Sequence, residues 1–188
     1  YQGAGTSFNI NRDKVARDMG FASSENNSHD AISDRSYVID FLYCCVMIQN
    51  TLSKMVSDLI EWSAPGNGYI TISNTLIKSP SMQVNVQDFS SLELIKAQAA
   101  LSSGQLTSAL SILNNGDSSG YSASFELLPD LVFSAAKHLL TSLKACTLVI
   151  SNIAVDRSKT KEASPHGYAL ANDLYEWLVI NTSKTPYQ

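Results

Sequence analysis

The chain has few charged residues, and those it has are mostly acidic. Asp, Glu, Lys and Arg make up 16% of its 188 residues, against roughly 25% in typical globular domains. Acidic residues outnumber basic ones by 17 to 13, which gives a formal net charge of −4. A nucleic-acid-binding protein needs a basic surface, so we predict that nucleic acid is not a partner. The sequence also lacks an uninterrupted run of about 18 apolar residues, which excludes a membrane-spanning helix.

Cysteine is scarce too, and its placement excludes a disulfide framework. Two of the three cysteines are the neighbours Cys44 and Cys45, and the third is Cys146. Neighbours on a helix project about 100° apart, so they cannot form a disulfide without breaking the helix. Buried, reduced thiols indicate an intracellular compartment, and the sequence does not distinguish the cytoplasm from an organelle such as the mitochondrion. No signal or transit peptide is visible, although Tyr1 lies within what resembles a continuing chain.

Apolar residues recur at helical spacing over long stretches. Between residues 28 and 64 no Gly or Pro interrupts the pattern, which predicts one helix with Ser28 as its N-cap and residues 65–68 as its stop. Such a helix would span roughly 50 Å and would need a long bundle partner. Its apolar positions are Ile32, Phe41, Leu42, Cys45, Val46, Ile48, Leu52, Met55, Val56, Leu59 and Ile60.

Further elements follow from the same periodicity. Helices are predicted at about 11–19, 90–113, 125–152, 155–163 and 167–180, and an extended piece at 69–72. Pro129 is compatible with the helix at 125–152 only if its regular turns begin there. In the last helix, we expect these residues to face inward: Tyr168, Leu170, Leu174, Trp177 and Leu178.

Long helices with short connections predict an all-α helical bundle. We expect one domain with three segments: an N-terminal loop segment with a short helix (1–27), the long-helix bundle (28–152) and short C-terminal helices packed on it (153–188). Apolar residues spread widely around the first and third long helices, which indicates contact on more than one side. We interpret this as association with protein subunits, either copies of the chain or other proteins. A monomeric three-helix bundle is the alternative.

Five stretches, in this order, resemble the argininosuccinate lyase family of the fumarase/aspartase superfamily. They lie at 3–8, 27–35, 52–63, 92–96 and 169–175. The resemblance covers nearly the whole chain but only the central and C-terminal part of a full-length lyase. It implies an all-α long-helix bundle of the fumarase/aspartase type. It also implies a homotetramer whose active sites combine residues from three subunits, with no cofactor and no metal ion.

The resemblance also implies a reaction. Such lyases remove a proton beside a carboxylate, form a dianionic aci-carboxylate, and release fumarate and arginine. A base must be poised near the proton, and fixed positive charge must meet the developing negative charge. In the family, a loop with the pattern glycine-serine-serine-x-methionine-proline-x-lysine-x-asparagine-proline supplies a serine base, and its lysine and asparagine bind carboxylate.

This chain departs from that pattern at the decisive residues. The second serine falls on Ser81, but the lysine falls on Val86, or on Asn85 if the register is moved by one. No Lys or Arg lies between Lys78 and Lys96. Losing one such donor typically costs on the order of 10² to 10³ in rate. Ser81 is therefore a vestigial catalytic residue in this interpretation.

The other site positions are also depleted. In the unshifted register the loop's asparagine falls on Asp88, whose negative charge would repel a dianion. A second polar segment of the family aligns with 121–129, where only Tyr121 remains. The remnant candidates for substrate binding are Asn27, Ser28, Asp30, Arg35 and Tyr121. For those at 27–35, capping and ion pairing at the start of the long helix is the alternative that we favour.

The histidines add no catalytic motif. The family's histidine-containing motif aligns upstream of this chain, and His29, His138 and His166 do not lie in such a context. We expect exposed or capped side chains at all three positions.

Three functions stay open. The leading hypothesis is a catalytically degenerate lyase-like protein that acts as a structural subunit. The enzyme alternative is one half of a split argininosuccinate lyase, with the missing motifs supplied by another polypeptide. The third is a regulatory module that binds arginine or another amino acid through Arg35 and Tyr121.

Overall fold

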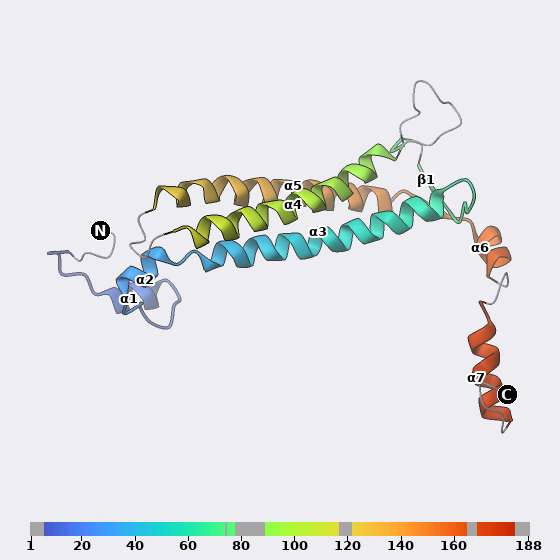
Figure 1. Ribbon diagram of the computed structural model, residues 1–188, viewed down its shortest axis with the longest axis horizontal. Helices are drawn as coiled ribbons and strands as arrows, with labels where there is room; N and C mark the ends of the chain where they lie inside the picture. The colour runs from blue at the N-terminus through green and yellow to red at the C-terminus, as the bar shows by residue number, and fades with distance from the viewer. Residues whose placement is uncertain (1–5, 74, 78–88, 117–121, 165–168, 183–188) are drawn as a thin grey trace. The chain divides into compact units, whose positions relative to one another are not determined.

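The computed structural model describes residues 6–73, 75–77, 89–116, 122–164 and 169–182, and these are mainly helical, as predicted. Figure 1 shows three long helices and several short ones. The helices are α1 (Arg12–Asp18), α2 (Ser28–Ser33), α3 (Ser36–Ser63), α4 (Ser90–Asn114), α5 (Leu128–Ile150), α6 (Arg157–Ala163) and α7 (Ala171–Asn181). A 3₁₀ turn, η1 (Ala123–Leu127), precedes α5, and the strands are β1 (Ile70–Ile72) and β2 (Ile153–Val155). None of the described helices has the length and hydropathy needed to cross a bilayer.

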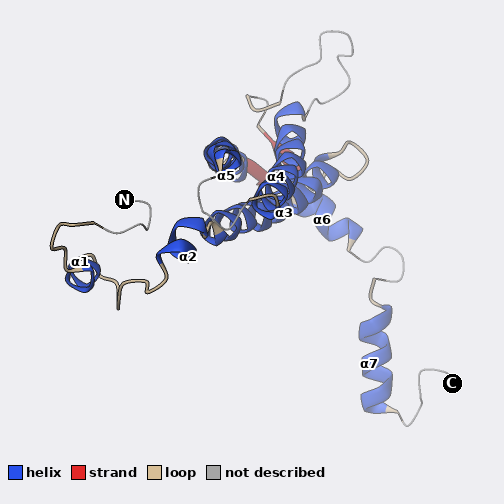
Figure 2. Ribbon diagram, turned by 60° about the vertical axis from the view of Figure 1, so that its left-hand side comes forward, coloured by secondary structure: helices blue, strands red, loops and turns tan. Residues whose placement is uncertain are grey.

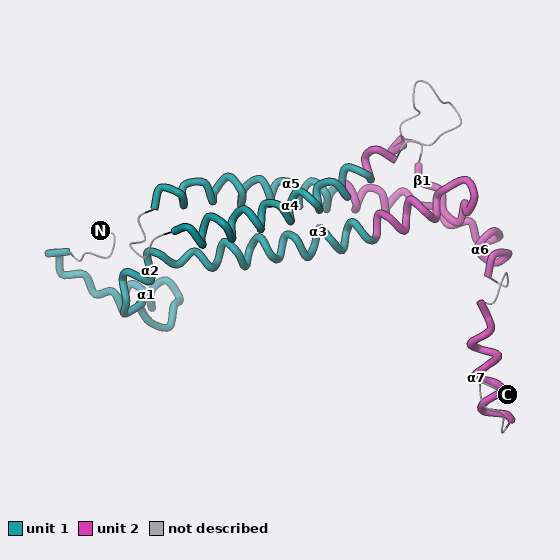
Figure 3. The backbone as a smooth tube through the Cα atoms, viewed as in Figure 1, with its two compact units in different colours: residues 1–54, 93–144 teal, residues 55–92, 145–188 magenta. Residues whose placement is uncertain are grey.

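The chain forms two compact units (Figure 3). Unit 1 contains Tyr1–Lys54 and Glu93–Lys144, and unit 2 contains Met55–Leu92 and Ala145–Gln188. Each of the three long helices contributes to both units. The boundaries between the two units fall within α3, α4 and α5 and do not coincide with residues 27 and 152. The predicted single domain with divisions after residues 27 and 152 stays a prediction.

The single helix predicted from 28 to 64 is wrong, because the helix is broken at its second turn. α2 ends at Ser33 and α3 begins at Ser36. Between them Asp34 is extended (φ −68°, ψ 124°), and its Oδ1 accepts the backbone N–H of Ser36 at 2.7 Å. Asp side chains compete in this way with the helical hydrogen bond. Ser28 is not the N-cap either, since the Asn27 side chain accepts the N–H groups of His29 and Asp30.

In unit 1, α3, α4 and α5 pack together around an apolar core (Figures 1 and 2). Its buried members are Val38, Leu42, Ala109, Leu128 and Ala135. Burying apolar surface contributes about 25 cal/mol per Å², so this core supplies much of the stability of unit 1.

Several apolar residues of the predicted helices are exposed. On α3, the apolar positions Phe41 and Ile48 are 42% and 41% exposed. On and before α7, Leu170, Leu174 and Trp177 were predicted to face inward, but they are more than half exposed, and α7 has no buried residue. Helical periodicity identified the apolar faces correctly, but it does not tell which of two apolar faces is covered within one chain.

Unit 2 contains a short β-ribbon that the sequence predicted only in part. The extended piece predicted at 69–72 is β1, which pairs antiparallel with β2. The backbone N–H of Asp156 donates to the carbonyl of Tyr69 at 2.9 Å. The Asp156 carboxylate then accepts the N–H groups of Ser158 and Lys159 and so caps α6. α6 therefore begins later than the predicted residue 155, because that residue is used by the strand.

We expect Gly68→Ala to destabilise the chain by about 1 kcal/mol, because Gly68 has a φ of +59°, which L-residues with a Cβ adopt at a cost. A Cβ there would also lie 2.7 Å from Nζ of Lys159, a contact that the flexible lysine can relieve. Urea denaturation measures the difference. Gly66→Ala is the matched control, since a Cβ at Gly66 meets nothing within 4 Å. Equal effects of the two substitutions would contradict this account.

Candidate functional site

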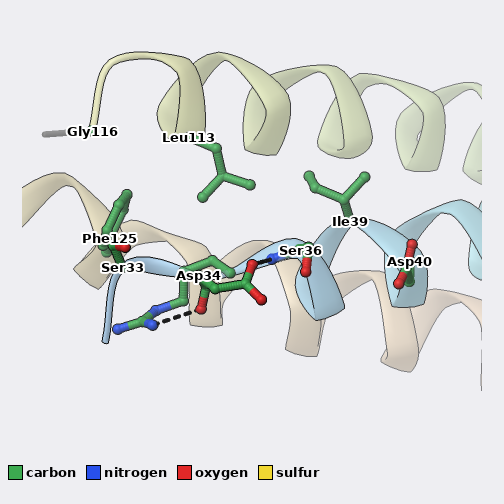
Figure 4. A pocket seen from close by; sticks show the side chains of 9 residues that line it. Ser33, Asp34, Ser36, Ile39, Asp40, Leu113, Gly116 and Phe125 are labelled. Atoms are coloured by element: carbon green, nitrogen blue, oxygen red, sulfur yellow. Dashed lines mark hydrogen bonds between the residues drawn. The ribbon is translucent and has the colours of Figure 1, made fainter. Parts of the chain in front are cut away.

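A cavity of about 570 Å³ in unit 1 lies beside the break between α2 and α3. Figure 4 shows Ile39 of α3 and Leu113 of α4 pointing toward one another across it. The residues of the break form the polar side of the cavity. Asp34, which ends α2, and Arg35, which follows it, bring charged groups to the cavity wall. The lining residues are Ser33, Asp34, Arg35, Ser36, Ile39, Asp40, Leu113, Gly116 and Phe125.

Among the residues that line this cavity, Arg35 carries the positive charge, and its guanidinium already interacts with other groups of the protein. Its Nη1 donates to the carbonyl of Ile32 at 2.5 Å and to the carbonyl of Asp34 at 2.8 Å. The guanidinium also lies 5.4 Å from the centroid of the Phe125 ring, a cation–π distance. Arg35 therefore closes the C-terminal end of α2 and attaches it to η1, rather than presenting free donors to a ligand.

Two carboxylates line the same cavity. The backbone hydrogen bond from Ser36 lowers the pKa of Asp34, with smaller contributions from the Ser36 side chain and the nearby Arg35 charge. Asp34 is thus ionised at neutral pH, and Asp40 one turn later is exposed. With two acidic side chains and one engaged guanidinium, the lining does not favour a dianionic ligand.

The predicted site residues fall into three groups. Arg35 lines the cavity, whereas Asn27 and Asp30 lie at the N-terminal end of α2 and pair with one another, Nδ2 to Oδ2, at 2.6 Å. Ser28 is partly buried at the first position of α2. Ser81 and Tyr121 lie outside the described residues. A role in substrate binding stays a prediction for all of them.

The structure adds Phe125 to the candidates, a residue that the sequence analysis did not select. It lies in the segment that aligns with the second polar segment of the lyase pattern, at a position that the pattern leaves unspecified, so the sequence held no signal for it. Phe125 lies beneath the Arg35 guanidinium and lines the cavity. It gives this end of the bundle an apolar wall where the lyase pattern has a polar substrate site.

The described part of the chain offers no metal site. Nowhere among these residues do three or more His, Cys, Asp or Glu side chains gather as ligands. His29 is exposed, His166 lies outside the described residues, and His138 is half-buried, with its Nδ1 inside the bundle. The expectation of an exposed or capped side chain is therefore wrong for His138.

Comparison with known proteins finds similarity to one group of enzymes. A protein-family model described as Lyase matches residues 2–79. Argininosuccinate lyase 1 of Mesorhizobium japonicum is 32% identical over 176 residues, which cover 94% of this chain and 38% of that protein. Argininosuccinate lyase of Ehrlichia chaffeensis is 32% identical over 178 residues, covering 95% and 38%. The chain therefore spans less than two fifths of the length of these relatives.

Solved structures show the same fold. A crystal structure of EDDS lyase in complex with formate matches with a TM-score of 0.77 and 21% identity, over 98% of this chain and 36% of that one. A structure of an EDDS lyase variant with bound fumarate matches equally well. The helical arrangement is thus that of the fumarase/aspartase superfamily, as predicted.

We expect Arg35→Gln to lower the free energy of unfolding by about 1–2 kcal/mol, because two carbonyls lose a charged donor and Phe125 loses its cation. Lys137→Gln on the exposed side of α5 is the matched control and should have little effect. Urea denaturation of both variants gives the values. An Arg35→Gln protein as stable as the Lys137→Gln control would contradict the structural role of Arg35.

Proposed function

We propose that the chain is a lyase of the fumarase/aspartase superfamily that has lost lyase turnover and acts as a structural subunit. The proposal is supported by its similarity to argininosuccinate lyase over nearly the whole chain and by the shared fold. The chain associates with further copies of itself through the uncovered side of its helical bundle. The observation that carries the loss of turnover is the absence of any Lys or Arg between Lys78 and Lys96.

The chemical argument starts from the intermediate of the reaction. Removing a proton beside a carboxylate concentrates two negative charges on neighbouring atoms, and an enzyme lowers this barrier with fixed cations and donors. In the lyase pattern the lysine of the loop supplies one of them. Here Val86 or Asn85 stands in its place, and Asp88 adds a negative charge. The change disfavours the dianion instead of stabilising it.

The second depleted segment supports the same proposal. Where the lyase pattern has asparagine, arginine, aspartate, glutamine and lysine, residues 122–129 are Ser, Ala, Ser, Phe, Glu, Leu, Leu and Pro. Phe125 and Leu128 of this segment pack on the apolar core, and Leu128 is 3% exposed. This segment now serves packing, which removes polar groups that would hold a substrate.

The structural role is supported by an apolar stripe on α3 that the described residues of unit 1 leave exposed. It consists of Tyr37, Phe41, Cys44 and Ile48, all of them exposed. These positions follow a spacing of four, three and four residues, directly beside the buried stripe at Val38, Leu42, Cys45 and Gln49, which has the same spacing. A helix with two adjacent seams of this kind is built to pack against helices on two sides.

A second uncovered stripe lies on α5. Phe133 is 73% exposed, and Leu140 one heptad later is 54% exposed. No charged residue interrupts the stripe on α3, so water contacts a continuous apolar surface in the isolated chain. Contiguous exposed apolar surface marks a protein interaction site. A second copy presents the same seams with the same spacing, and we therefore assign it as the occupant.

A split lyase is the second candidate, favoured by the 32% identity and by the fraction of its relatives that the chain spans. Active sites shared among subunits permit another polypeptide to supply the missing motifs. The lysine separates the split lyase from the inactive protein. In the lyase pattern it belongs to the loop that this chain carries, so a working split enzyme should have kept it.

The two functions are separated by an assay of argininosuccinate cleavage, followed by the ultraviolet absorbance of fumarate. We expect no turnover above background, because the loop has no cation. The assay uses the full chain together with any protein that co-purifies, and an active argininosuccinate lyase is run in parallel as the positive control. Fumarate release at a rate within about 10³ of that control would refute the loss of turnover and favour the split enzyme.

Association is tested by light scattering with Ile48→Asp. We expect the wild-type chain to be oligomeric and the variant to shift to a smaller mass, because a carboxylate in the apolar stripe loses hydration when it is buried. Asn50→Asp adds the same charge at an exposed position two residues away, outside the stripe, and should leave the mass unchanged. Circular dichroism verifies that both variants stay helical. A monomeric wild-type chain would contradict the structural role.

A further inference from the structure

Unit 1 contains a group of buried polar side-chain atoms that have no hydrogen-bond partner among the described residues. They are Nε2 and Oε1 of Gln49, Oγ of Ser102, Oε1 of Gln105 and Nδ1 of His138. Gln49 is 0% exposed, Ser102 1% and Gln105 8%. The four side chains come from all three long helices: Gln49 from α3, Ser102 and Gln105 from α4, and His138 from α5.

Two hydrogen bonds between α4 and α5 show how Ser102 and His138 are placed relative to one another along the bundle axis. Nε2 of Gln105 donates to Oγ of Ser134 at 2.9 Å, and Oγ of Ser142 donates to Oε1 of Gln98 at 2.6 Å. The two helices therefore run antiparallel. Ser102 lies three and four residues from the two α4 partners, and His138 lies four residues from each α5 partner. The two side chains thus lie at the same height in the bundle.

The position of α3 follows from the cavity described above. Ile39 of α3 and Leu113 of α4 face one another across it (Figure 4). Gln49 lies ten residues after Ile39, and Ser102 lies eleven residues before Leu113, which is about 15 Å along each helix. Gln49, Ser102 and His138 therefore form one level, with the Gln105–Ser134 and Gln98–Ser142 pairs above and below it.

The polar groups at this level need hydrogen-bond partners. A buried amide or hydroxyl that gives up water and gains nothing bears the full cost of desolvation. Ser102 and Gln49 hold donors as well as acceptors, Oε1 of Gln105 is an acceptor, and Nδ1 of His138 accepts in one tautomer. The partner must be small, must both donate and accept, and must fit between three helices.

We propose that this level binds water, and that one or more internal water molecules join α3, α4 and α5 through Gln49, Ser102, Gln105 and His138. A buried water typically makes about three hydrogen bonds, which suits a site with donors and acceptors on three sides. The bound water fixes the register of the helices. A shift of α3 by one turn would bring the Gln49 amide to the level of a Gln–Ser pair whose members already hydrogen-bond to one another, so the water site favours the present register, as a buried polar residue does in a coiled coil. This site is independent of the proposed loss of turnover.

The direct test is NMR on the full-length wild-type chain, with nuclear Overhauser effects measured between solvent water and the side-chain amide protons of Gln49. A long-lived internal water tumbles with the protein, so its cross-peaks have the same sign as those between protons of the protein. We expect such cross-peaks at the Gln49 amide. Cross-peaks absent at Gln49 would overturn the proposal, because the amide would then be paired directly with a protein group. The side-chain amide of Asn50, exposed on the next residue, is the internal control and should show only solvent exchange.

Thermal unfolding provides the second test. We expect Gln49→Leu to lower Tm by roughly 3–8 °C, because Ser102 and His138 lose the water that joined them to α3. The triple variant Gln49→Leu, Ser102→Ala, His138→Leu removes three of the four partners, leaves only Oε1 of Gln105, and should recover part of the loss. Asn50→Leu makes the matched change in an exposed position and should leave Tm nearly unchanged. A single Gln49→Leu variant that is as stable as the wild type would overturn the proposal, and if that variant does not fold, the NMR result on the wild type decides.

Discussion

The structure depends on how apolar side chains are distributed around its three long helices. On α3, one seam at Val38 and Leu42 is buried within unit 1, while the adjacent seam at Phe41 and Ile48 is exposed. Each Å² of apolar surface kept in water forgoes about 25 cal/mol of stabilisation. A helix with two apolar seams keeps one of them in water when the chain is alone, and this exposed seam links the fold to the proposed structural role.

The charges at the end of the bundle serve the fold. Asp34 ends α2 and caps α3, and Arg35 satisfies the carbonyls left by that break while it covers Phe125. In a working lyase such charged groups would have to meet a dianion. Here they meet backbone groups and an aromatic ring, and Phe125 belongs to the segment that aligns with a polar segment of the lyase pattern. The proposed loss of turnover and the packing of this end of the bundle thus involve the same stretch of the chain.

Much of this was readable from the sequence, and the exceptions have physical causes. Helical periodicity predicted α4 and α5 within a few residues, and the lyase resemblance predicted the fold. The break at Asp34 was missed because it arises from a side-chain hydrogen bond and not from Gly or Pro. The exposed Leu174 and Trp177 were predicted to face inward, because periodicity locates an apolar face without showing what covers it. The unpartnered Gln49 could not be identified either, since its burial depends on the register of α4 and α5.

The central claim is that the exposed seam of α3 is covered by another copy of the chain. If folding and association are coupled in this way, stability depends on protein concentration through mass action. The measurement that tests this most directly is Tm by calorimetry across a hundredfold range of concentration at constant buffer. The account predicts that Tm rises steadily with concentration. A Tm that stays constant over the whole range, with reversible unfolding, would show that one chain is stable alone and would contradict the account.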